Sequence, residues 1–278
     1  MSLLKKIKFK LHKLKQLVWH KLSMQSAHFF NPTVRAQLKD PKSIPIIIIS
    51  FNQLYYLKQL IDFLLDSGYT NIVVLDNAST YKPLLDYFNA IKDQVSIYKK
   101  KDNTGHLSFW KTDEVFKTYS KGYYAVTDAD IVPLAECPDN FMEVFRKLLD
   151  EAYDRTKVGF SLKIDDIPDS NSNKPQIVNW EHKFWTSQIK PNVYKAEIDT
   201  TFALYRPNYN YKLKHFTKGW RTDAPYQARH GGWYIDTNRL TEEQEYYMKT
   251  ANDSASWQID NEGNLVNKIH QKMYNQNE

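Results

Sequence analysis

Two carboxylates one residue apart, Asp128 and Asp130, end the apolar segment YYAVTDADIVP. Where a strand ends, one carboxylate of such a pair can accept a hydrogen bond from a sugar or ribose hydroxyl, while the other binds a hard divalent cation. The bound cation in turn neutralises a diphosphate. Solvated turns also contain this tripeptide, but its position after the fourth strand of an alternating pattern favours a metal and nucleotide site.

Polar residues also end the first two expected strands. The first ends in SFN, where Ser50 and Asn52 can meet a base and a ribose, and the second ends in DNAS, where Asp76, followed by Asn77, can accept a hydrogen bond from a base N–H. Parallel strands bring their carboxyl ends to one edge of the sheet, where ligands bind. The structural alternative is that these residues only form turns and helix caps.

A further candidate segment, NTGH, follows the third expected strand and contains Asn103 and Gly105. Glycine lets the backbone approach a ligand closely, and the segment leads toward a helix, whose N–H groups favour anions. It is predicted to contact the nucleotide, although any surface loop can have this composition.

The elements that must position these residues alternate between strand and helix. Short β-branched runs predict strands buried on both faces, and apolar residues at helical spacing, with a stop at Gly68 after the first helix, predict the helices between them. Such alternation implies a doubly wound, mainly parallel α/β sheet with right-handed crossovers. The expected strands are 44–52, 71–80, 95–100, 123–133 and 158–164, and the expected helices are 54–69, 81–91, 112–123, 140–153 and a capped one from Thr241; residues 165–180 are expected to be a polar loop.

The order IPIIIISFN, VVLDNAST, DNTGHLSFW and VTDADI resembles the nucleotide-binding half of GT-A fold glycosyltransferases, in particular the large family-2-like group, over residues 44–133. The resemblance implies a Rossmann-like sheet that binds a nucleoside diphosphate sugar, with UDP as the expected nucleotide. It further implies that Asp76 contacts the base, Asp128 the ribose or sugar, and Asp130 the metal, which is Mn²⁺ or Mg²⁺ in this family. The expected organisation is a basic segment at 1–40, a nucleotide-sugar-binding half at 41–135 and an acceptor-binding, catalytic half at 136–278.

The second half must supply a base that takes the proton of the acceptor hydroxyl in an inverting transfer. Asp223, in the segment GWRTDAP, is the first candidate, because it follows a turn that contains the aromatic Trp220, a platform for an acceptor sugar, and precedes Pro225, which suits the first turn of a helix. The alternative is that Asp223 only caps that helix. Asp199 is the reserve candidate. The family's usual Glu-Asp pair is absent.

The segment around His230 lies where the family often places a metal-binding histidine. A neutral imidazole would complete an octahedral shell with Asp130 and diphosphate oxygens, although a lone histidine is more often structural. Arg221 and Arg229 are candidate partners of the diphosphate through charge-assisted hydrogen bonds.

The first 22 residues predict a basic amphipathic helix. Six aliphatic residues recur at spacings of three and four, and seven lysines lie among the other positions, which is typical of a helix that lies on an anionic membrane. Lysines interrupt every window long enough to span one. The alternative is a helix packed on the body or on another subunit. The aliphatic positions are Leu3, Ile7, Leu11, Leu14, Val18 and Leu22.

Charge and cysteine content indicate the partners and the compartment of the protein. Residues 1–39 hold nine Lys or Arg and no Asp or Glu, which leaves 29 basic and 32 acidic residues in the rest of the chain. The positive charge is therefore concentrated in one segment, which argues against nucleic acid as a partner. A single cysteine, Cys137, suits a reducing compartment. We expect a cytoplasmic protein on the inner face of a membrane, with a surface-glycan or lipid-linked acceptor.

Two other classes of protein share part of this pattern. A nucleotidyltransferase that makes sugar nucleotides uses a similar sheet, but it normally has a Gly-rich loop after its first strand, and this chain has SFNQLYYL there. A non-catalytic peripheral membrane module would leave the polar strand ends without a purpose. The phosphate-binding patterns G-x-x-x-x-G-K and G-x-G-x-x-G are absent.

Overall fold

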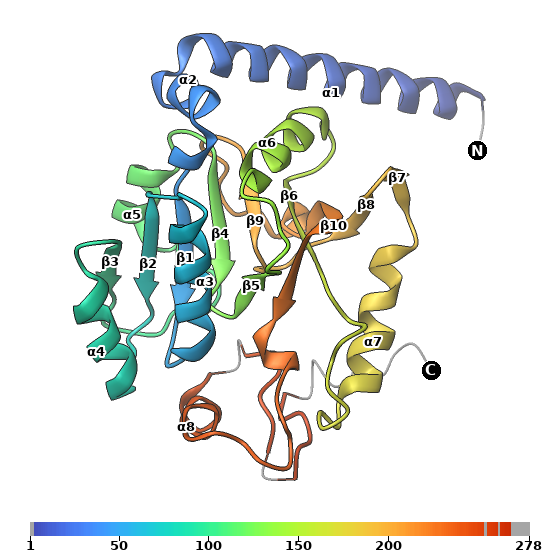
Figure 1. The fold of residues 1–278 in the computed structure, drawn as a ribbon. Coiled ribbons are helices and arrows are strands. Elements are labelled where there is room, and N and C mark those ends of the chain that lie inside the picture. The colour runs from blue at the N-terminus through green and yellow to red at the C-terminus, as the bar shows by residue number, and fades with distance from the viewer. Residues whose placement is uncertain (1–2, 253–254, 261, 268–278) are drawn as a thin grey trace.

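The computed structural model describes residues 3–252, 255–260 and 262–267 (Figure 1). The helices are α1 (Leu3–Phe30), α2 (Pro32–Lys39), α3 (Tyr55–Asp66), α4 (Lys82–Ile91), α5 (Asp113–Tyr119), α6 (Phe141–Glu151), α7 (Lys174–His182) and α8 (Glu242–Thr250). The strands are β1 (Ile46–Ser50), β2 (Ile72–Asp76), β3 (Ser96–Lys99), β4 (Tyr124–Asp128), β5 (Ile131–Pro133), β6 (Lys157–Leu162), β7 (Gln188–Lys190), β8 (Val193–Glu197), β9 (Ala203–Tyr205) and β10 (Lys218–His230).

All these strands join one sheet in the order β3-β2-β1-β4-β9-β6-β10-β8-β7, with β5 paired to β10. The strands β3, β2, β1 and β4 are parallel, as predicted. In the second half only β6 and β10 are parallel, because β9 runs antiparallel between β4 and β6, and β8 and β5 run antiparallel to β10. The predicted α/β architecture with an N-terminal helix is confirmed, and its carboxyl-terminal half is more antiparallel than expected.

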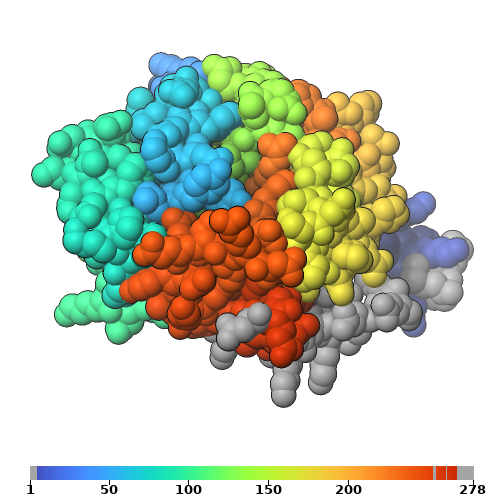
Figure 2. Space-filling view, turned by 60° about the horizontal axis from the view of Figure 1, so that its bottom comes forward, coloured from blue at the N-terminus to red at the C-terminus, as the bar shows by residue number. Residues whose placement is uncertain are grey.

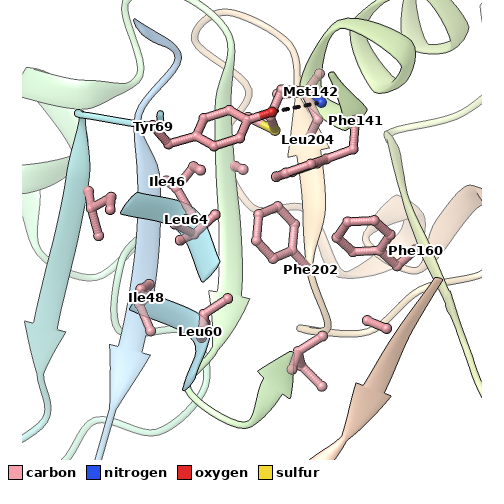
Figure 3. Packing of buried hydrophobic residues seen from close by; sticks show 14 of the residues in the cluster. Ile46, Ile48, Leu60, Leu64, Tyr69, Phe141, Met142, Phe160, Phe202 and Leu204 are labelled. Carbon is pink, nitrogen blue, oxygen red and sulfur yellow. Dashed lines mark hydrogen bonds between the residues drawn. The ribbon is translucent and has the colours of Figure 1, made fainter. Parts of the chain in front are cut away.

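The central strand β1 is buried on both faces, which explains its unbroken apolar run. Side chains alternate across a strand. Ile46 and Ile48 therefore face Leu60 and Leu64 of α3 in the cluster that also contains α4 and α6 (Figure 3). Ile47 and Ile49 face a second cluster on the other side of the sheet, which includes Val115 of α5. Helices on both faces give the sheet its doubly wound form.

Two expectations about the second half were wrong. Residues 165–180, predicted to be a polar loop, include most of α7, which has Pro175 in its first turn. The helix predicted at Pro225 does not form, because this residue lies inside β10. The register of β10 against β6 shifts between Thr222 and Gln227, and such a bulge accommodates a proline within a strand. Pairing on both sides of β10 thus overrides the local helix signal.

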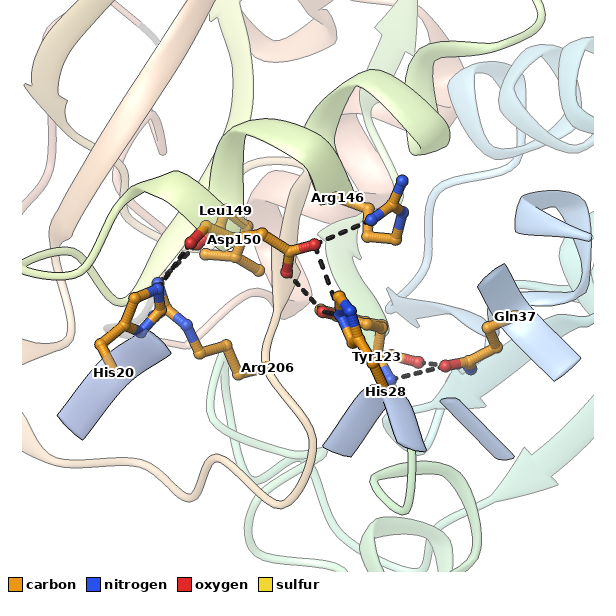
Figure 4. A network of polar contacts seen from close by, with 8 residues as sticks. All are labelled: His20, His28, Gln37, Tyr123, Arg146, Leu149, Asp150 and Arg206. Carbon is orange, nitrogen blue, oxygen red and sulfur yellow. Dashed lines mark hydrogen bonds and ion pairs between the residues drawn. The ribbon is translucent and has the colours of Figure 1, made fainter. Parts of the chain in front are cut away.

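Helix α1 is longer than predicted and runs along the edge of the sheet where β4 begins (Figure 1). Its second half is held by a polar network (Figure 4). His20 Nε2 donates to the backbone oxygen of Asp150 at 2.6 Å, and His28 Nε2 lies 3.0 Å from the hydroxyl of Tyr123. Arg146 donates to the Asp150 carboxylate at 2.8 Å. Among the described helices, none is long and apolar enough to cross a bilayer.

Candidate functional site

A cavity of about 1000 Å³ lies at the edge of the sheet where β1, β2 and β4 end. Its lining comes from these strand ends, from the 103–106 loop, from the end of β10 and from the segment that includes α8. Figure 2, which brings the lower edge of Figure 1 forward, shows this orange segment between the cyan region of α3 and α4 and the yellow region near α7. The volume is sufficient for a ligand of nucleotide-sugar size.

Asp128 and Asp130 both line the cavity, at the turn between β4 and β5. One Asp128 oxygen accepts a hydrogen bond from the hydroxyl of Thr200 at 2.6 Å. Burial, and next the charge of Asp130, raise the pKa of Asp128 well above its usual range, while the Thr200 hydroxyl opposes this shift. A cation bound here would favour the charged form of Asp128, because metal ligands must be deprotonated.

The turn after β10 holds His230 against Asp130. His230 Nδ1 lies 3.3 Å from Asp130 Oδ2, and the N–H of Gly232 lies 3.2 Å from both of these atoms. The ring of His230 stacks on Trp233 with 4.9 Å between centroids. A side chain at Gly231 would come within 2.3 Å of the Tyr56 ring, so only glycine permits this close approach. The turn therefore fixes the position of the imidazole.

The donor atoms suit Mn²⁺ or Mg²⁺. Within the described ranges, no three His, Cys, Asp or Glu side chains are close enough to form a metal centre by themselves. Asp130, Asp128 and His230 nevertheless line one cavity and offer hard oxygen and imidazole nitrogen atoms. Mg²⁺ is usually held by one or two carboxylates together with substrate phosphates. The residues present fit a cation whose shell is completed by a diphosphate.

Of the other predicted nucleotide contacts, Asn77, Asn103 and Gly105 line the cavity. The Asn77 side chain donates to the backbone oxygen of Gly105 at 3.1 Å and accepts from Ser108, so it ties β2 to the 103–106 loop. Gly105 has a φ of +74°, a conformation that favours glycine. These residues shape the wall next to the end of β2.

Ser50, Asn52 and Asp76 are buried and lie outside the cavity lining, so the structure does not support the direct donor contacts predicted for them. The Asn52 side chain accepts from the N–H groups of Thr80 and Tyr81 and donates to Thr250. Asp76 accepts from the N–H of Ser79 at 3.0 Å. Asp76 therefore stabilises the turn after β2, which is the structural alternative to a direct contact with the base. These side chains build the turns behind the cavity.

Three predicted residues of β10 also lie outside the cavity lining. Asp223 sits in the bulged part of the strand, where its carboxylate accepts from the N–H of Ala224. Arg221 is buried in an ion pair with Glu181 at 2.6 Å. Trp220 lies under the ammonium group of Lys190, 5.5 Å from the ring centroid. The expected placement failed because the segment is a strand, not a turn leading into a helix.

Two other predicted residues do reach the cavity, Asp199 and Arg229. Asp199 is exposed, and its backbone oxygen accepts a hydrogen bond from Lys157. The guanidinium of Arg229 donates to Asp166 through Nε and Nη2, and its remaining N–H groups can donate to a diphosphate.

Sequence reasoning missed Lys157, a buried lysine on β6. Its ammonium also donates to the Tyr205 hydroxyl at 2.9 Å. Burial lowers the pKa of Lys157 to about 7, although the nearby Asp199 and Asp128 favour its charged form. It fixes the backbone before Thr200, the partner of Asp128. The only signal in the sequence is a lysine at the start of an otherwise apolar strand.

The wall formed by α8 was also missed. Glu243 accepts from the N–H of Tyr55 at 3.0 Å, and Asn52 donates to Thr250 at 2.9 Å, so both ends of α8 are tied to the β1–α3 connection. Tyr247 and Arg239 line the cavity from this side. The capping box at Thr241 predicts the helix but gives no indication of the contacts it makes.

Comparisons with known proteins find only distant likeness. No family model matches the chain, and no curated protein does. Among solved structures, the mannosyltransferase PcManGT from Pyrobaculum calidifontis, in complex with GDP-Man and Mn²⁺, shares 11% identity at a TM-score of 0.42 over 84% of this chain and 72% of its own. TarS of S. aureus shares 11% identity at a TM-score of 0.44, and the match covers 83% of this chain and 42% of TarS. An apo UDP-glucose pyrophosphorylase shares 10% identity at a TM-score of 0.38, and the match covers 75% of this chain and 100% of its own.

We predict that Thr200→Val will shift the pH dependence of cation binding. Loss of the hydroxyl removes a hydrogen bond that favours the charged form of Asp128, so its pKa rises further and Mn²⁺ binding requires a higher pH. The measurement is calorimetric titration of Mn²⁺ with UDP or GDP across a pH series. Thr201→Val is the matched control, because the Thr201 hydroxyl has no hydrogen-bond partner in the described structure. Identical pH profiles for the two variants would contradict the prediction.

Proposed function

We propose that this chain is a metal-dependent glycosyltransferase that moves a sugar from a nucleoside diphosphate donor, with UDP as the expected nucleotide, to a hydroxyl of a glycan or lipid-linked acceptor. One observation carries the proposal: Asp128 and Asp130 line a cavity of nucleotide-sugar size at the carboxyl edge of a parallel sheet, where His230 lies against Asp130. Ligands of open α/β sheets bind at this edge.

Each residue has a proposed role in the transfer. Asp130, Asp128 and His230 would hold Mn²⁺ or Mg²⁺, which when bound neutralises the charge on the departing diphosphate. Asn77 and the 103–106 loop position the nucleoside, and Arg239 and Arg229 bind phosphate oxygens.

Asp199 is the proposed base, because it is exposed within the cavity, whereas Asp223 is not among the residues that line it. It takes the proton of the acceptor hydroxyl while that oxygen bonds to the anomeric carbon. The bond from this carbon to the diphosphate breaks, and the nucleoside diphosphate leaves with the electron pair.

The competing activity is nucleotidyl transfer, which would release pyrophosphate. The loop after β1 argues against it, because Phe51 to Leu54 contain no glycine that could wrap a triphosphate. Incubation with a sugar phosphate and a nucleoside triphosphate separates the two activities. Release of pyrophosphate would overturn the transferase proposal.

We also propose that α1 holds the protein on an anionic membrane surface at the cytoplasmic face. The stripe residues from Ile7 to Leu22 are exposed, and residues 1–39 contain no acidic side chain. Each lysine near an anionic surface contributes about 1 kcal/mol to binding.

Asp130→Asn is expected to abolish metal-dependent nucleotide binding, because the amide removes the negative charge opposite the cation. Calorimetric titration of UDP and GDP, each with and without Mn²⁺, measures the loss and identifies the nucleotide. Asp223→Asn removes the same charge outside the cavity and should bind like the wild type. Metal-dependent binding that survives in Asp130→Asn would remove the metal site from the proposal.

Asp199→Asn is expected to retain donor binding and to lose transfer by roughly 10²–10⁴-fold, the contribution typical of a general base. The measurement is turnover of the nucleotide sugar identified by the titrations, with Asp223→Asn as the control of equal charge. If Asp223→Asn loses turnover and Asp199→Asn keeps it, the assignment of the base is wrong.

The double variant Leu11→Ser, Val18→Ser should lose roughly 3–5 kcal/mol of vesicle binding, because two apolar side chains no longer enter the lipid. Co-sedimentation with phosphatidylcholine vesicles that do or do not contain phosphatidylserine measures it. His12→Ser, Gln16→Ser changes two exposed polar positions outside the stripe and should bind like the wild type. Equal binding of both variants would refute the role of the stripe.

A further inference from the structure

The two faces of α1 have different surroundings. At 100° per residue, His20, Met24 and His28 lie within about 80° of one another, and all three contact the body. Leu11 and Val18 lie about 120–140° around the helix from Met24. They are 60% and 46% exposed, and Phe29, further along the same face, is 74% exposed. The centre of the apolar stripe therefore lies about 120° around the helix from the centre of this contact face, and the stripe is exposed to solvent.

Lysines border this stripe on both sides. By the same helical geometry, Lys10 and Lys21 lie along one margin and Lys8 and Lys15 along the other, and all four are exposed. An apolar face flanked by lysines fits the boundary between acyl chains and anionic headgroups. A second protein copy would have to supply both an apolar surface and a matching acidic rim.

A second exposed apolar residue lies at the same edge of the sheet. Leu213 is 82% exposed and stands between the exposed Lys212 and Lys214. Its loop follows β9 and is tied to this edge, because the N–H of Asn208 donates to the backbone oxygen of Ser120 just before β4. Asn208 also borders a shallow depression whose other walls include the end of α1 and the α1–α2 connection.

The cavity lies at the opposite edge. Tyr123, which contacts His28 of α1, precedes β4, and Asp128 ends this strand (Figure 1). A five-residue strand spans about 13 Å and a packed helix adds a diameter of about 10 Å, so the cavity carboxylates lie roughly 20 Å from the free face of α1.

We propose that the free face of α1 and the Leu213 loop form one bilayer-facing surface, which holds the cavity on the side of the protein away from the membrane. This inference rests on the proposed function and narrows its acceptor. A sugar attached directly to a lipid headgroup would not reach the cavity, so the acceptor is the outer end of a glycan chain or a soluble glycan.

The orientation can be measured with a fluorophore on a single introduced cysteine. Gln25→Cys marks the free face of α1, Leu213→Cys marks the loop, and Lys249→Cys marks α8 beside the cavity. Labelled wild type controls for Cys137, which is buried. Each labelled protein is added to phosphatidylcholine–phosphatidylserine vesicles that contain lipids with a nitroxide quencher at the headgroup or in the acyl chain.

Strong quenching is expected at positions 25 and 213, and none at 249. Quenching at 249, or its absence at 213, would overturn the proposed orientation. The protein could instead sediment as a dimer, with the fluorophore at position 25 already shielded before vesicles are added. This result would show that a second copy of the chain covers the free face of α1, and it would also overturn the proposed orientation. Titration of UDP or GDP with Mn²⁺ into the same samples tests the proposed function separately: the expected quenching without nucleotide binding would support the orientation and reject the enzyme.

Discussion

Parallel pairing of β1, β2, β3 and β4 is the constraint on which the rest of the molecule depends. Because these strands run in one direction, all their carboxyl ends lie at one edge of the sheet and all their amino ends at the other. The first edge receives the polar ends of the strands and forms the cavity. The second receives α1 and α2. The cavity and the proposed membrane contact are therefore separated by the length of a strand.

At the cavity edge, burial makes the charged form of Asp128 costly unless a cation is present. The pKa of Asp128 is raised chiefly because its charge is removed from water, and the second carboxylate adds repulsion. Thr200 and Lys157 offset part of this penalty, one by a hydrogen bond to the carboxylate and the other by a buried positive charge nearby. A divalent cation with a diphosphate would offset much more, which is the physical link between this geometry and the proposed donor.

The polar contacts of α1 with the body determine which face of this helix is exposed. His20 and His28 bind the end of α6 and the residue before β4, and in doing so they orient the whole helix. The stripe of Leu11 and Val18 has no contact with the body that would bury it. Its exposure follows from the contacts that His20, Met24 and His28 make with the body.

The sequence by itself determined the strands β1 to β4, the helices between them and the cavity position of Asp128 and Asp130, because apolar periodicity and strand-end polarity are local patterns that parallel pairing preserves. It did not determine whether a polar residue near a strand end points into the cavity or behind it, as the burial of Asn52 and Asp76 shows. It also misplaced Asp223, because β10 pairs with β6 and β8, which are distant in sequence, and this pairing outweighs the local signal of Pro225. Only the tertiary structure decided these positions, because side-chain direction and strand pairing depend on partners that no local pattern specifies.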